Sequence, residues 1–60
     1  MNYVLNTFKG GTPEAAEQWL SYLGESHMIK YIPSKRFASG EVVSVNYSLP
    51  DGCYIICVAE

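Results

Sequence analysis

The side chains best suited to binding chemistry in this sequence are basic and aromatic residues near its middle: Lys30, Tyr31, Lys35, Arg36 and Phe37. Cationic groups beside aromatic rings can contact phosphates, stack on nucleotide bases or bind an acidic protein partner. An ordinary solvated loop would explain the same residues. Among the functional alternatives we expect a protein partner, because the chain carries a formal net charge of −2 at pH 7 and would weaken any phosphate contact.

A second candidate binding site is the segment Lys9-Gly10-Gly11-Thr12, just before the predicted start of a helix. Exposed backbone N–H groups at such a position attract phosphate. The segment lacks the spacing of a P-loop or of a dinucleotide fingerprint, and a flexible strand-to-helix connection explains it better. Together with the Lys30–Phe37 cluster, this helix start at Gly10–Thr12 defines an alternative function as a small nucleotide- or nucleic-acid-binding module.

Catalytic arrangements find little support in the sequence. The chain has one histidine, His27, so any Ser-His-Asp or Cys-His arrangement would depend on that residue alone. Glu14 and Glu17 belong to the expected first turns of a helix, where a favourable interaction with the helix dipole accounts for them. No carboxylate pair indicates acid–base catalysis, and no set of metal ligands is evident. We therefore expect no enzyme activity, no cofactor and no metal site.

The two cysteines, Cys53 and Cys57, lie four positions apart in a predicted strand. At about 3.3 Å per residue their Cα atoms are about 13 Å apart, too far for a disulfide or for shared ligation of one zinc ion. We expect free, buried thiols that act as small hydrophobic side chains.

Local patterns predict one helix and four strands. A first strand is expected over Met1–Phe8. Thr12 as N-cap and Pro13 at the first helical position predict a helix that ends near Leu23, with Gly24 as its C-terminal stop. The apolar residues of this helix share one half of its circumference: Ala15, Ala16, Trp19, Leu20, Tyr22 and Leu23.

Beyond the helix, a second strand is predicted from about His27 to Ile32, ended by Pro33, with Met28, Lys30 and Ile32 on one face. The polar segment Ser34–Gly40 is predicted to be a loop. The order β-α-β-β-β predicts an α+β fold with one amphipathic helix packed on a four-stranded, mostly antiparallel sheet.

The segment Glu41–Glu60 predicts a β-hairpin around the turn Leu49-Pro50-Asp51-Gly52-Cys53, a type I turn with a bulge at Gly52. This turn places Leu49 opposite Cys53. One face is then the expected core face, with Val43, Val45, Tyr47, Leu49, Cys53, Ile55, Cys57 and Ala59. On the reverse face, Tyr54, Ile56 and Val58 form an apolar stripe, which a partner, a second copy or the Ser34–Gly40 loop would cover.

Length and composition limit the classes of protein to which this chain can belong. Sixty residues, 48% of them hydrophobic and only 17% charged, predict a single folded domain over residues 1–60. The sequence pI of about 5.2 argues against a dedicated nucleic-acid-binding protein. No run of eighteen apolar residues and no secretory leader is present, so we expect a complete cytoplasmic protein without a membrane span.

The pattern resembles a family of small bacterial and phage-borne single-helix domains of unknown function. The residues that carry the resemblance are Tyr3-Val4-Leu5, Leu20-Ser21-Tyr22-Leu23-Gly24 and Gly52-Cys53-Tyr54-Ile55-Ile56-Cys57-Val58. The chain departs from that pattern after the helix, where Glu25-Ser26-His27-Met28 replaces a Gly-Trp-Glu-Leu-like step. The resemblance implies the β-α-β-β-β fold and no particular activity.

Small size, acidic charge and the lack of a catalytic set favour an interaction protein. The leading hypothesis is a non-catalytic phage or mobile-element accessory protein. It would bind, and could inhibit, a host protein complex such as a defence nuclease or a transcription component. Its predicted contact residues are the Lys30–Phe37 cluster together with Tyr54, Ile56 and Val58, and we expect a homodimer through the last strand.

Overall fold

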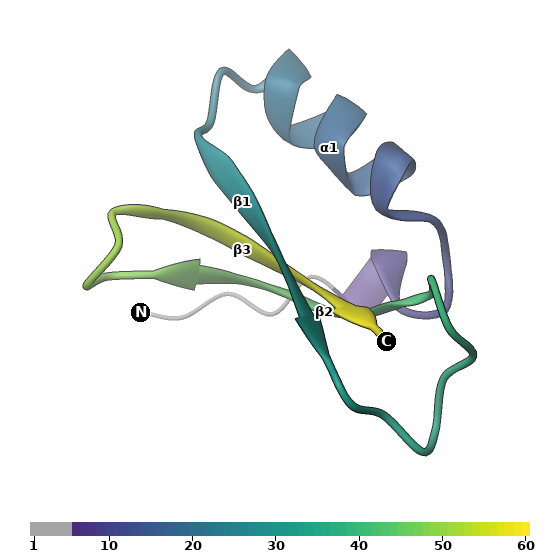
Figure 1. Cartoon of the computed structure of the whole chain (residues 1–60). Coiled ribbons are helices and arrows are strands. Elements are labelled where there is room, and N and C mark those ends of the chain that lie inside the picture. The colour runs from purple at the N-terminus through teal and green to yellow at the C-terminus, as the bar shows by residue number, and fades with distance from the viewer. Residues whose placement is uncertain (1–5) are drawn as a thin grey trace.

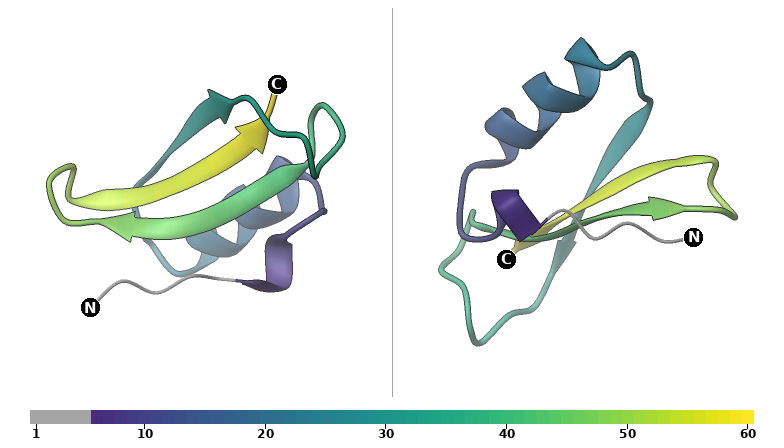
Figure 2. Two further views of the ribbon diagram at one scale, coloured as in Figure 1. Left: turned by 90° about the horizontal axis from the view of Figure 1, so that it is seen from below. Right: turned by 180° about the vertical axis from the view of Figure 1, so that it is seen from behind.

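The backbone of the computed structural model, which describes residues 6–60, forms one α-helix on one face of a three-stranded sheet (Figure 1). A 3₁₀ turn, η1 (Asn6–Phe8), precedes helix α1 (Pro13–Tyr22). The strands are β1 (His27–Ile32), β2 (Val42–Ser48) and β3 (Cys53–Ala59). Seen from below, the strands lie in front of α1, which shows that the helix covers only one face of the sheet (Figure 2, left).

Helix α1 begins and ends where local chemistry predicts. Thr12 occupies the N-cap position with extended backbone angles, although its side chain makes no capping hydrogen bond, and Pro13 follows. At the other end, the N–H groups of Gly24 and Glu25 donate to the carbonyls of Ser21 and Leu20 at 3.0 and 2.9 Å. This is a Schellman motif, which requires a left-handed residue that glycine supplies at φ 74°.

The buried stripe of α1 is narrower than the sequence pattern predicts. Ala16 and Leu20, one helical turn apart, are fully buried against the sheet. Tyr22 is 88% exposed and Leu23 48% exposed, so the prediction that they face the core is wrong. Ala16 and Leu20 lie four residues apart on one side of the helix, and these two are the helix residues in the core cluster.

The predicted four-stranded sheet is wrong. The described residues form a mixed sheet of three strands in the order β1-β3-β2, in which β3 pairs parallel with β1 and antiparallel with β2. Of the first predicted strand, Asn6–Phe8 forms η1 instead, and residues 1–5 lie outside the described part of the chain. The central strand is apolar along almost its whole length, as expected for a strand buried on both faces.

The hairpin between β2 and β3 has a longer loop than predicted. Ser48, not Leu49, lies opposite Cys53, so the loop comprises the four residues 49–52. The N–H of Gly52 donates to the carbonyl of Ser48 at 2.8 Å, and the Ser48 hydroxyl donates to the Asp51 carboxylate at 2.7 Å. Because side chains alternate between faces along a strand, this shift of one residue turns β3 over relative to its predicted orientation.

The core forms between α1 and the sheet face that includes Val45, Ile56 and Val58. Phe8 of η1 and Tyr54 of β3 pack against its margin. An irregularity between Val42 and Ser44 allows Val42, rather than the predicted Val43, to pair with Val58 and become fully buried. The predicted inward positions on β2 are therefore correct at Val45, whereas those on β3 are wrong.

Candidate functional site

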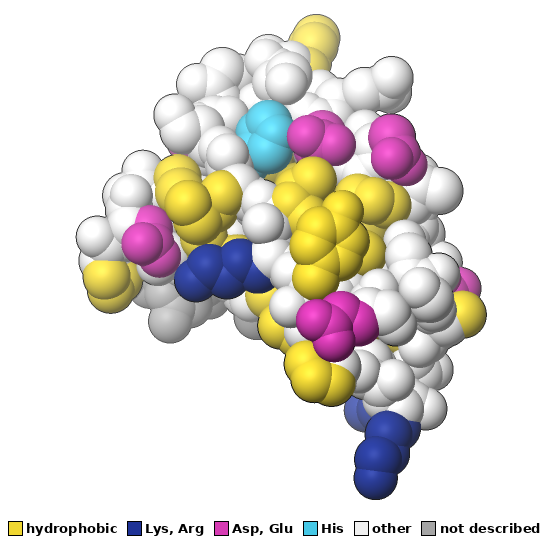
Figure 3. All heavy atoms as spheres, in the orientation of Figure 1, with side chains coloured by type: hydrophobic (Ala, Val, Ile, Leu, Met, Phe, Trp, Pro, Cys, Tyr) yellow, Lys and Arg dark blue, Asp and Glu magenta, His cyan; other side chains and the backbone are white. Residues whose placement is uncertain are grey.

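The structure disperses the basic and aromatic cluster predicted at Lys30–Phe37. Lys30 and Tyr31 are adjacent residues of β1 and point to opposite faces of the sheet, Tyr31 to the face that α1 covers. Lys35 and Arg36 are exposed in the connection between β1 and β2. Figure 3 shows Lys and Arg side chains at two separate places on one side of the molecule. No single phosphate-sized footprint brings these charges together.

Phe37, the last member of the cluster, is half-buried, and its ring lies beside Gly10, where an added Cβ would come within 3.9 Å of it. The surrounding loop is held by local hydrogen bonds. The Ser34 hydroxyl accepts from the N–H groups of Arg36 and Phe37 at 3.2 Å, and the Glu41 carboxylate accepts from the N–H of Ala38 at 2.7 Å. The connection is therefore an ordered structural element in which Phe37 serves packing.

The predicted stripe of Tyr54, Ile56 and Val58 is not an exposed surface. Ile56 and Val58 are 0% and 1% exposed and lie in the core beneath α1, and Tyr54 is half-buried at its margin. The cause is the longer hairpin loop, which places these three side chains on the helix side of the sheet. The predicted contact surface and the predicted dimer interface both required these side chains to be exposed. Neither can form on this face of β3, because the face is internal.

The glycines before α1 do not form a free cradle of N–H groups. The N–H of Gly10 donates to the carbonyl of Val42 at 2.8 Å, and that of Gly11 donates to the carbonyl of Phe8 at 3.0 Å. The carbonyl of Gly11 in turn accepts from the N–H of Val42 at 2.9 Å. These bonds fasten the segment before α1 to the start of β2, so the two donors expected to meet a phosphate are already engaged.

His27 joins the sheet to the helix. Its Nε2 atom lies 3.2 Å from the Glu17 carboxylate, and the two side chains are 21% and 38% exposed. Glu17 therefore does more than interact with the helix dipole, because it connects α1 to the first residue of β1. The contact therefore ties α1 to β1. Among residues 6–60, no group of three or more His, Cys, Asp or Glu side chains could hold a metal ion.

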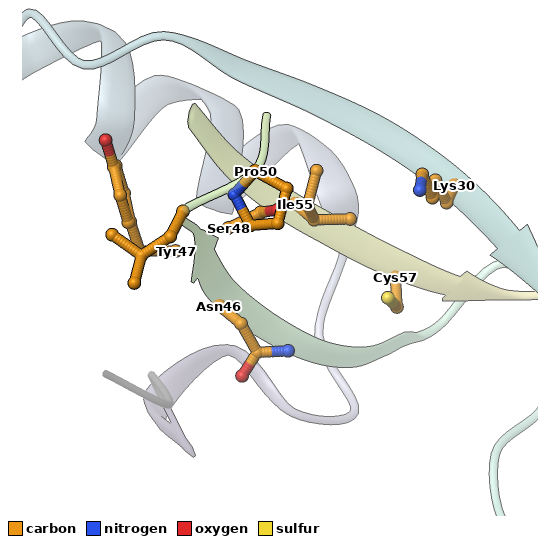
Figure 4. A pocket seen from close by; sticks show the side chains of 8 residues that line it. Lys30, Asn46, Tyr47, Ser48, Pro50, Ile55 and Cys57 are labelled. Atoms are coloured by element: carbon orange, nitrogen blue, oxygen red, sulfur yellow. The ribbon is translucent and has the colours of Figure 1, made fainter. Parts of the chain in front are cut away.

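The clearest candidate site is a hollow on the sheet face opposite α1, with a volume of about 540 Å³. We call it the sheet-face hollow. It draws residues from all three strands and from the hairpin loop: Lys30, Asn46, Tyr47, Ser48, Leu49, Pro50, Ile55 and Cys57. Figure 4 shows Ile55 and Cys57 along β3 between Lys30 on one side and Asn46 on the other.

Strand register explains how these side chains come together. Lys30 of β1 lies directly opposite Cys57, and Asn46 of β2 lies directly opposite Ile55. Ile55 is only 7% exposed and forms an apolar floor, whereas Leu49 at the hairpin is 68% exposed. The chain therefore places one ammonium group, one amide and a hydroxyl around an apolar floor.

This arrangement offers groups that can bind another molecule. The ammonium group of Lys30 can pair with a carboxylate, and Asn46 and Ser48 can donate or accept hydrogen bonds. The hollow contains no carboxylate and no imidazole to act as a general base. A shallow apolar site with few polar groups is typical of a contact for another molecule's side chain.

Of the eight predicted contact residues, only Lys30 belongs to the sheet-face hollow. The predicted register assigned Ile55 and Cys57 to the core and therefore missed them as site residues. Both thiols are free, as predicted, but they are half-buried on the face away from α1 rather than within the core. One signal in the sequence could have indicated this face: the polar side chains of Ser44, Asn46 and Ser48 alternate along β2 with the side chains that point toward α1.

Comparisons with protein-family models, with curated proteins and with solved structures found no match to this chain. The resemblance to small phage-borne domains therefore stays a prediction. Within the part of the chain that the structure describes, no helix combines the length and apolar character needed to cross a membrane. The geometry of the sheet and its exposed side chains is therefore the basis for a functional proposal.

Proposed function

We propose that this protein is a non-catalytic protein-binding module whose partner docks at the sheet-face hollow. The observation that carries the proposal is the one-sided fold, in which α1 covers one face of the sheet (Figure 2). The hollow lies on the other face (Figure 4), and the exposed Leu49 belongs to its lining. Exposed apolar side chains around a hollow favour contact with another protein. The hollow of about 540 Å³ is large enough for one or two apolar side chains of a partner.

The chemistry of the hollow defines the partner segment that would fit it. Leu49 and Ile55 supply apolar contact, and Lys30 is the only charged residue among those that line the hollow. The complementary segment therefore carries an apolar side chain next to a carboxylate. Lys30 is exposed in the free protein, and docking over the apolar floor beside it would remove water from its contact with the carboxylate. Charge reversal at Lys30 should therefore weaken binding more than charge reversal at a loop residue outside the contact.

The biological setting that we propose is a phage or mobile-element accessory protein that binds a host protein complex and could inhibit it. Small size, acidic charge and a hollow lined by neither a carboxylate nor an imidazole support this setting. A defence nuclease and a transcription component remain equal candidates for the partner. The stripe of Tyr54, Ile56 and Val58 no longer supports it, because those side chains contribute to the core.

Two matched pairs of variants test the docking site. Lys30→Glu in the hollow is compared with Lys35→Glu in the exposed loop, and Leu49→Asp with Tyr22→Asp, both at exposed apolar positions. Each protein is first checked for folding by circular dichroism, and binding to the partner identified with the unmodified protein is then measured by calorimetry. We expect loss of binding for the hollow variants and near-normal binding for their controls. Equal behaviour within each pair would contradict the proposed site.

A further inference from the structure

Strand β1 lies at an edge of the sheet, and its outer side has no partner strand among residues 6–60. The carbonyls of Ser26 and Ile32 accept hydrogen bonds from the N–H groups of Tyr54 and Glu60 at 3.0 and 2.9 Å. Because successive residues of a strand direct their backbone groups to alternate sides, the odd-numbered residues between them face outward. The N–H and C=O groups of His27, Ile29 and Tyr31 therefore form an open row along this edge.

The side chains beside that edge are apolar and exposed. Tyr31 is 63% exposed on the helix side of the sheet, and Met28 is 41% exposed on the opposite side. Figure 3 shows hydrophobic side chains gathered across the middle of the molecular face on which β1 lies in front. An edge strand with unpaired backbone groups and apolar flanks is a template for pairing with another strand.

We infer that β1 is a self-association edge, through which two copies of this chain pair antiparallel to form a continuous six-stranded sheet. This inference does not depend on the proposed function, because it is argued from the outward backbone groups of β1, although the Lys30 side chain belongs both to this strand and to the sheet-face hollow. A two-fold axis at Ile29 would align residues 27–31 of β1 with the same residues of the other copy. The outward backbone groups of His27 in one copy then meet those of Tyr31 in the other, and Ile29 meets its own counterpart.

Side-chain complementarity favours a second copy as the occupant of this edge. In the register centred on Ile29, Lys30 lies opposite Met28 of the other copy, and no like charges meet. A register centred on Lys30 would place two ammonium groups face to face, which is destabilising. His27 would lie opposite Tyr31 of the other copy, on the helix side, and both helices would lie on the same face of the joined sheet.

The interface is small, because it consists of one strand of six residues from each copy. Interfaces of this extent are weak and reversible. We therefore expect a dimer whose population rises with protein concentration, measured by sedimentation velocity over a wide concentration range. A chain that stays monomeric up to about 1 mM, the limit of weak specific affinity, would overturn the inference.

Tyr31→Pro tests the backbone contact directly. Proline removes the N–H of residue 31, which faces outward and takes no part in the β1–β3 ladder, so the fold should tolerate it as edge strands do. Tyr31→Thr is the matched control, because it shortens the side chain but keeps the N–H. We expect Tyr31→Pro to weaken dimerisation at least about tenfold relative to Tyr31→Thr, since each interface loses two hydrogen bonds. Equal dimerisation of the two variants would overturn the inference.

A cross-linking experiment tests the register and does not depend on how the fold tolerates proline. Met28→Cys and Lys30→Cys are combined with Cys53→Ser and Cys57→Ser, so that only the two new thiols remain. In the inferred register, positions 28 and 30 of opposite copies form a close, non-hydrogen-bonded pair suited to a disulfide. We expect mild oxidation to join position 28 of one chain to position 30 of the other, identified by mass spectrometry. Absence of this bond would overturn the inferred register.

Leu49→Asp separates this inference from the proposed function. Leu49 belongs to the hairpin loop and lies outside β1, so its substitution should leave dimerisation unchanged while it abolishes partner binding. If dimerisation fails in the unmodified chain but partner binding remains sensitive to Leu49→Asp, only the self-association inference is overturned. If the unmodified chain dimerises but partner binding is insensitive to Leu49→Asp, only the proposed docking site is overturned.

Discussion

Tyr47 and Tyr54 lie directly opposite each other on β2 and β3, and their rings meet edge to face with centroids 5.2 Å apart and planes at 80°. The pair can form only if both residues point to the same face of the sheet. It therefore belongs to the observed register, with Ser48 opposite Cys53, and is incompatible with a register that pairs Tyr47 with Ile55. The contact is therefore a marker of the orientation of β3 and of which side chains lie on each face of the sheet.

The first prediction concerns the ring pair itself. In a double-mutant cycle with Tyr47→Ala and Tyr54→Ala, we expect a coupling energy of about 0.5–1.5 kcal/mol, because edge-to-face aromatic pairs contribute beyond their buried area. Free energies of unfolding from urea titrations supply the four corners of the cycle. A coupling energy near zero would show that the rings do not meet in solution.

The second prediction distinguishes the two faces of β3. Ile56 is fully buried in the core, so Ile56→Ala should lower the free energy of unfolding by about 2–5 kcal/mol. The gentler Ile56→Val, at about 0.5–1.5 kcal/mol, provides a measurement if the alanine variant does not fold. Cys57→Ala, on the other face, should cost less than Ile56→Ala. If Cys57→Ala cost more stability than Ile56→Ala, Cys57 would face the core, as the predicted three-residue turn requires.

The third prediction uses the two thiols as probes of the same face. Cys53 and Cys57 are free and half-buried, and the strand register places them on the side of the sheet away from α1. A small maleimide should therefore modify both in the folded protein, with rates that do not follow global unfolding. Mass spectrometry of labelling at increasing urea concentrations measures this. If both thiols react only as the chain unfolds, they are internal and the faces are assigned wrongly.

The fourth prediction concerns the link between His27 and Glu17. Both side chains are partly exposed, so water competes for the contact and Glu17→Gln should cost less than about 1 kcal/mol. Any part of this contribution that comes from charge should shrink at high salt. Thermal unfolding at two salt concentrations measures it, with Glu14→Gln as the control on the same helix. We also expect His27→Ala to leave partner binding intact, and a complete loss of function without unfolding would indicate a catalytic histidine.

The fifth prediction addresses the alternative function in nucleotide or nucleic-acid binding. The Gly10 and Gly11 donors are engaged within the protein, and the basic residues are dispersed. Titrations with a nucleotide panel and short single strands at low salt should therefore be flat. Binding that weakens steeply as salt rises would contradict this, because such a slope reports phosphate contacts.

Features governed by neighbouring residues were predictable from the sequence. Pro13 and Gly24 correctly marked the ends of α1, because a missing N–H group and a left-handed residue act within a single turn of backbone. Likewise, His27 and Pro33 bounded β1, and the alternation along that strand correctly separated Lys30 from Tyr31. The polar residues of β2 also indicated that Val45 and Tyr47 point toward the core.

The tertiary structure alone decided the register of the hairpin, the parallel pairing of β1 with β3, and hence the candidate site. Strand β3 is apolar on both faces, so its pattern cannot show whether Ile55 or Ile56 lies beneath α1. A Pro-Asp-Gly turn fits a loop of three or of four residues, and only packing against Leu20 and Tyr47 selects between them. Because one residue of register exchanges the two faces of a strand, that choice placed Ile56 in the core and Ile55 in the sheet-face hollow.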